Sequence, residues 1–92
     1  MARPKMVNPG IVFAKVTINP PSVAANTALE VTQTINGLRV GYPVIVWAPN
    51  LEANLILANA HCSAANTLKF RLQNTTSSSI DPASQPFYVV QF

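Results

Sequence analysis

Hydrophobic and polar residues alternate along much of this chain, and the period is two. In residues 67–73, Leu68, Phe70 and Leu72 alternate with polar or charged side chains. Such alternation is typical of a β-strand with one face buried and the other in water. Because Lys69 and Arg71 mark the outward side of this strand, we expect Leu68, Phe70 and Leu72 to lie in the core.

Further short segments have the character of strands. Residues 29–35 alternate in the same way, with Leu29, Val31 and Ile35 inward. Residues 44–47 are apolar at every position, which predicts a central strand or a strand whose outer face is covered by a neighbouring subunit. The remaining predicted strands cover residues 11–18, 55–62 and 87–92.

Turn-forming residues separate these segments, and helical periodicity of useful length is absent. The turns are Asn19-Pro20-Pro21-Ser22, Asn36-Gly37 and Pro49-Asn50. Short strands in this spacing predict an all-β domain: a small antiparallel β-sandwich or a jelly-roll-like barrel of about six to eight strands. We expect most aromatic side chains, Phe13 and Phe70 among them, to lie in its core.

Two connections and one terminus stand apart from this pattern. The sequence Ala-Ala-Asn-Thr occurs at residues 24–27 and 64–67, and Asn26 and Asn66 are expected to make equivalent corners with positive φ. Residues 74–86 form a long polar stretch, a length typical of functional or mobile loops. Residues 1–10 are predicted to be an extended arm before a single domain of residues 11–92. That arm either lies along a neighbouring molecule or is a frayed terminus.

The composition points to contact with other proteins. Charged residues make up 10% of the 92 residues and hydrophobic residues 49%, whereas soluble domains have about 25% charged residues. The surface must therefore consist largely of Thr, Ser, Asn, Gln and small apolar side chains. Another protein can desolvate such a surface at low cost, so we expect a structural or assembly role.

Other partners are not expected. The net charge is +3, but the six basic residues form no block, and nucleic-acid binding needs several converging cations. No apolar stretch is long enough for a membrane helix or an export signal. Cys62 is the sole cysteine, which excludes an internal disulfide and fits synthesis in a reducing compartment.

The chain offers little for catalysis. His61 and Cys62 are adjacent, so in a strand they face opposite sides of the sheet and cannot form a nucleophile and base pair. The three acidic residues have no spacing relation, and a zinc site needs about four ligands. We therefore expect no enzyme, no metal and no cofactor, although His61 could join a three-histidine site across a trimer axis. Asn74-Thr75-Thr76 matches a glycosylation sequon, which we interpret as coincidental without an export signal.

Several turn and strand motifs resemble those of small tailed-bacteriophage virion proteins, above all head decoration (cement) proteins. The resemblance covers roughly residues 15–92. It departs at Tyr42, Asn54, His61 and Cys62, where charge is lost from positions expected to be exposed. The motifs are Ser22-Val23-Ala24-Ala25-Asn26-Thr27, Gly37-Leu38-Arg39-Val40-Gly41, Pro49-Asn50-Leu51, Ser63-Ala64-Ala65-Asn66-Thr67-Leu68, Asn74-Thr75-Thr76, Ile80-Asp81-Pro82 and the closing aromatic strand.

The resemblance implies a β-sandwich that binds the major capsid protein on the capsid exterior, often as a homotrimer, after assembly in the host cytoplasm. Arg3 and Lys5 are then candidates for capsid contact. Candidates for subunit contact are Val44, Val46, Trp47 and Phe92. The alternative is a tail or head fibre accessory module that recognises a host surface glycan.

If the protein is such a glycan-binding module, Trp47 and Tyr88 are expected to be exposed beside residues 74–86, where their rings would stack on the sugar.

Overall fold

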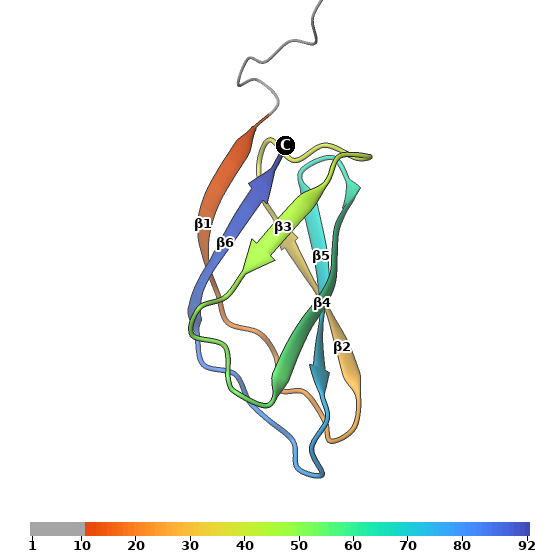
Figure 1. Ribbon diagram of the computed structural model, residues 1–92, viewed down its shortest axis with the longest axis vertical. Helices are drawn as coiled ribbons and strands as arrows, with labels where there is room; N and C mark the ends of the chain where they lie inside the picture. The colour runs from red at the N-terminus through yellow and green to blue at the C-terminus, as the bar shows by residue number, and fades with distance from the viewer. Residues whose placement is uncertain (1–10) are drawn as a thin grey trace, which may run out of the picture.

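The structure is a computed structural model that describes residues 11–92, and it contains six strands in two sheets (Figure 1). The arm expected at residues 1–10, with Arg3 and Lys5, lies outside the described residues. The strands are β1 (Val12–Ile18), β2 (Ala28–Thr34), β3 (Val44–Trp47), β4 (Leu55–Ala64), β5 (Thr67–Asn74) and β6 (Gln85–Gln91).

Each sheet has three antiparallel strands, in the orders β1-β6-β3 and β2-β5-β4. The chain passes from one sheet to the other at every connection except the hairpin between β4 and β5. Figure 1 shows the two sheets as separate layers, with β6 and β5 in their middles. The small all-β sandwich predicted from the sequence is therefore confirmed.

The inner faces of the two sheets form one core. Leu68, Phe70 and Leu72 of β5 are fully buried, as their alternation with charged residues predicts. Phe87 of β6 is also fully buried, and its ring centre lies 5.3 Å from that of Phe70. This pair joins the two sheets at the centre of the sandwich.

Of the two alternatives for residues 44–47, the central strand is wrong, and so is the core position expected for Phe13. The β3 strand pairs with β6 alone, so it is an edge strand and not a central one. Phe13 is 68% exposed because Val12, Ala14 and Val16 take the inward positions of β1. Small apolar side chains fill that side of the core, and the aromatic ring is left on the outer surface.

Positive φ angles occur at the corners that the repeated sequence predicts. Asn26 has φ 54° and Asn66 has φ 62°, a conformation that Asn tolerates better than most residues. Asn59, with φ 57°, lies in β4 where the register against β5 shifts between Ala58 and His61. This irregularity interrupts an edge strand, which discourages further strand pairing.

A buried amide in each sheet holds a neighbouring loop. The Asn74 side chain donates to the carbonyls of Val23 (3.1 Å) and Ser78 (2.8 Å), and its oxygen accepts from the Thr76 N–H and hydroxyl. Residues 74–86, whose length is typical of a functional or mobile loop, are therefore tied to the fold at their start. Ile80 extends this attachment, because it forms a β-bridge with Val23.

In the other sheet, the Gln91 side chain is fully buried against the loop before β3. It accepts from the Arg39 N–H and donates to the Arg39 carbonyl, both at 2.8 Å. A weaker bond of 3.4 Å reaches the Tyr42 carbonyl. The loop of residues 36–43 is thereby fixed at the end of the sheet where β6 finishes.

Candidate interaction surface

The outer face of the β1-β6-β3 sheet presents two rows of side chains that run across all three strands. One row is Phe13, Val90 and Ile45, which the strand register places side by side. The other is Lys15, Tyr88 and Trp47. We call this surface, together with Ile11 and Phe92 at its end, the apolar face.

The apolar face is exposed to an unusual degree. Trp47 is 63% exposed and Ile45 55%, and Ile11 and Phe92 are each more than half exposed. With a common area of about 180–200 Å² for each of these side chains and Phe13, within the range for large aromatic residues, their exposed fractions correspond to roughly 500–600 Å² of apolar surface. That is the upper end of the roughly 300–600 Å² found for the largest patch on a monomer, which is often functional.

The aromatic rings on this face contact one another. The Tyr88 ring centre lies 5.8 Å from that of Trp47 and 6.4 Å from that of Phe13, with the rings tilted in both pairs. The Lys15 ammonium lies 5.8 Å from the centre of the Tyr88 ring, within reach of a cation–π attraction. The charge of Lys15 is thus held over the face.

The loop of residues 36–43 extends the exposed apolar surface at the Phe92 end of the sheet. Val40 and Tyr42 are at least half exposed, and the Arg39 guanidinium lies 4.1 Å from the centre of the Tyr42 ring. Among residues 11–92, seven of the eight exposed large hydrophobic side chains belong to the apolar face or this loop. The eighth, Ile56, is on the opposite sheet.

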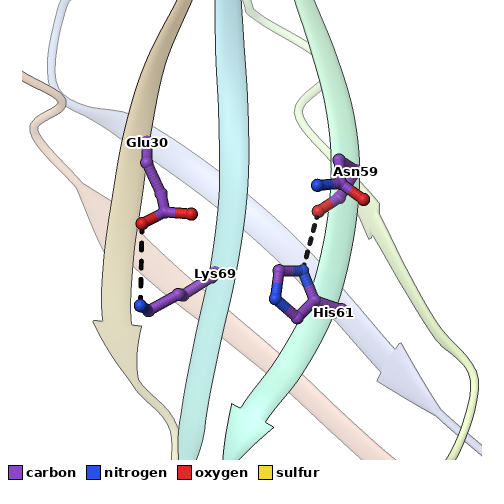
Figure 2. A network of polar contacts seen from close by, with 4 residues as sticks. All are labelled: Glu30, Asn59, His61 and Lys69. Carbon is purple, nitrogen blue, oxygen red and sulfur yellow. Dashed lines mark hydrogen bonds and ion pairs between the residues drawn. The ribbon is translucent and has the colours of Figure 1, made fainter.

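The outer face of the β2-β5-β4 sheet has a different character, and we call it the polar face. Figure 2 shows Glu30 of β2 and Lys69 of β5 as an ion pair, with His61 of β4 nearby. The Lys69 Nζ and Glu30 Oε1 atoms lie 3.6 Å apart. The His61 Nδ1 atom lies 3.0 Å from the Asn59 carbonyl oxygen. Arg71 lies in register with Glu30 on the same face. Both sheets expose one face to solvent, but the charges gather on this one.

The structure separates the residues predicted for subunit contact. Val44 and Val46 are half-buried and pack against the core, whereas Trp47 and Phe92 are exposed on the apolar face. Sequence reasoning missed Ile45 and Phe13, which share that face. The period of two along residues 44–47 contains the signal for Ile45, because it separates positions 44 and 46 from positions 45 and 47.

Groups with chemical reactivity do not converge in the part of the chain that is described. His61 is exposed and Cys62 is buried, so they face opposite sides of β4, as expected. The departure from the phage pattern at position 62 therefore falls in the core and not on the surface. Residues 11–92 contain no group of three or more His, Cys, Asp or Glu side chains that could hold a metal ion.

The carboxylate of Glu52 is held by hydrogen bonds, and its pKa is lowered. The N–H of Ala83 donates to its carboxylate at 2.9 Å and is the main cause that lowers the pKa of Glu52 below 4.5. The Gln85 amide and the backbone N–H of Glu52 act in the same direction, and partial burial opposes them. The ionised carboxylate thus fastens the end of the long loop that precedes β6.

Comparison of the chain with family models, with curated proteins and with solved structures finds no match. The resemblance to phage head decoration proteins therefore stays a prediction. Within residues 11–92, the structure has no helix with the length and apolar character needed to cross a membrane. The exposed apolar face is the feature on which a function can be argued.

Proposed function

We propose that this protein is a structural component of a bacteriophage virion, a capsid decoration protein that stabilises the head as a homo-oligomer. One observation carries the proposal: the sandwich exposes large apolar side chains on one sheet and charges on the other. Such an asymmetric surface suits a module that is buried on one side in an assembly. The resemblance of the turn motifs to those of decoration proteins supports the choice of a capsid as the assembly.

The mechanism of such a protein is thermodynamic and involves no covalent chemistry. A ligand that binds only the assembled shell stabilises that state by mass action. An oligomer that joins neighbouring capsomers turns several weak contacts into a strong one. The small fraction of charged residues in this chain reduces the desolvation cost of each contact.

The two predicted contact regions then have separate roles. Trp47 and Phe92, joined by Phe13 and Ile45, make the contact between copies of the chain. Val44 and Val46 support β3 from the core side. Arg3 and Lys5 precede the apolar face in the sequence and are proposed to pair with acidic groups of the major capsid protein on the shell exterior.

A fibre accessory module that binds a host glycan is the second candidate. The exposed Trp47 beside Tyr88 favours it, because aromatic rings stack on sugars. Two features weigh against it. The rings are tilted by 38° and form no flat platform. Side chains that could hydrogen-bond a sugar are also few on that face, since β1 supplies Lys15 and Thr17 alone. We therefore rank decoration first.

The test is quantitative mass spectrometry of purified virions from the phage that carries the gene, with cryo-electron microscopy of the head. A decoration protein is present in hundreds of copies on the outer shell. A fibre accessory module is present in tens or fewer, away from the shell lattice. Virions without this chain would overturn both proposals.

The roles of the arm and the domain can be separated by truncation. Deletion of residues 1–8 removes both arm cations and little apolar surface, so we expect the thermal unfolding of the isolated protein to stay nearly unchanged. Binding to purified shells that lack the protein should weaken. Equal loss of stability and binding would show that the arm belongs to the fold.

A further inference from the structure

We propose that the apolar face binds the same face of a second copy across a two-fold axis parallel to β6. The inference rests on the proposed function, because it specifies the contact between copies. It also changes the expected symmetry from a trimer to a pair.

The number of suitable surfaces supports a two-fold. A two-fold contact uses the same surface on both copies, whereas a ring of three needs two different surfaces that fit each other. Residues 11–92 present one large apolar surface, and the opposite sheet carries the Glu30–Lys69 ion pair and Arg71. The apolar face can therefore be covered most completely by itself.

The area is sufficient for such a pair. The roughly 500–600 Å² of apolar surface on this face approaches the ~800 Å² per partner of a standard interface once rim residues are added. Tyr42 and Val40, exposed on the adjoining loop, are placed to supply part of that rim. An interface of this size gives a pair that associates reversibly.

The register determines the direction of the axis. Because β6 is the central strand, a two-fold parallel to it leaves each row opposite the same row, with β1 facing β3 of the second copy. Lys15 then faces the indole of Trp47 of the other copy, which is the best cation–π partner. Phe13 faces Ile45 in the same way.

A two-fold that runs across the strands gives a poorer match. It would bring Phe92, at the apolar end of the face, opposite Thr17 and Pro86 at the other end. A two-fold parallel to β6 instead brings the two apolar ends together, including Ile11 and Phe92 of both copies. Burial of apolar surface on both sides therefore favours the parallel axis.

The experiment is sedimentation equilibrium of the full chain over roughly 1 µM to 1 mM, the range for a reversible pair. We expect a monomer–dimer equilibrium that Trp47→Lys weakens by at least ~30-fold, because it removes an aromatic anchor and faces Lys15 of the other copy. Ile56→Lys is the matched control, since it makes the same kind of change at a 50% exposed position on the opposite sheet. It should leave the equilibrium unchanged.

A charge swap tests the axis. The double variant Lys15→Glu with Trp47→Lys places opposite charges face to face across the parallel axis, so it should recover at least tenfold of the lost affinity. Unfolding curves of each variant report whether the monomer still folds.

A monomer or a trimer at all concentrations, or dimerisation insensitive to Trp47→Lys, would overturn the pairing. Failure of the double variant to recover affinity would overturn the parallel axis. A monomeric chain that still decorates shells would overturn the pairing but leave the decoration role standing. A dimer that is absent from virions would overturn the decoration role but leave the pairing standing.

Discussion

The two sheets of this sandwich are alike on their inner faces and unlike on their outer faces. Inside, Phe70 of β5 meets Phe87 of β6, and both strands alternate buried and outward residues. Outside, one sheet presents Trp47 among apolar neighbours and the other presents the Glu30–Lys69 ion pair. The fold is stabilised by the shared inner pattern, so the outer positions are free to serve a function.

The largest expected effect tests the likeness of the inner faces. Phe70→Ala and Phe87→Ala each empty the same central site, and we expect each to lower the free energy of unfolding by about 3–5 kcal/mol. Urea denaturation followed by circular dichroism measures both. A cost below 1 kcal/mol for one of them would show that the two sheets do not share the core equally.

The second prediction compares the two buried amides. Gln91→Met and Asn74→Leu remove hydrogen bonds while keeping similar volume, so each leaves buried backbone groups unpaired and should cost about 1–3 kcal/mol. The effects should be local. The rate of amide hydrogen exchange is expected to rise at residues 39–42 in the first variant and at residues 75–80 in the second. Each variant should leave the exchange rates in the other loop unchanged.

The third prediction concerns pH. Because the pKa of Glu52 is lowered in the folded state, its carboxylate stabilises the fold above pH 4.5, and this contribution is lost as the pH falls through the folded-state pKa. Glu52→Gln should therefore cost about 0.5–1.5 kcal/mol at pH 7, and the difference from the parent should shrink below pH 4.5. A difference that is constant down to pH 3 would contradict the hydrogen bonding described for this carboxylate.

The smallest effects belong to the outer cations. Lys69→Gln breaks an ion pair between two partly exposed side chains, and we expect a loss below ~0.5 kcal/mol. Lys15→Gln should change the stability of the monomer by as little. A larger loss at either position would show that the outer faces contribute to folding after all, and the contrast between inside and outside would weaken.

Local alternation was enough to predict most of the fold. In residues 67–73, Lys69 and Arg71 identify the outward side of the strand, and the three residues on the inward side are all buried. The β3 strand carries no such marker, because all four of its side chains are apolar. Its place at the edge depends on pairing with β6, a contact distant in sequence that composition cannot reveal.

The candidate surface was only partly predictable for the same reason. The apolar residues beside Trp47 in the sequence make it a contact candidate, but Tyr88 and Lys15 become its neighbours only through the register of three strands. The prediction that Phe13 lies in the core rests on its place in an alternating strand, and that alternation puts it on the outer side instead. The small side chains at positions 12, 14 and 16 could have suggested the reverse, since they fill the inner side of β1.

The hydrogen bonds of the buried Asn74 side chain explain why part of this chain has the sequence of a sugar-attachment signal. A signal of the form Asn-x-Thr also has the spacing that lets a threonine hydroxyl reach the amide two positions before it, and here Thr76 does so at 2.7 Å. The Asn74 amide nitrogen already donates to two carbonyls and is buried. A glycan on that nitrogen would replace one of these two donors at a buried position, so we expect glycosylation in a secreting host to destabilise the fold. Removal of the signal by Thr76→Val would in turn remove the hydrogen bond between the Thr76 hydroxyl and the Asn74 side chain. A non-glycosylating host is therefore the suitable source of this protein.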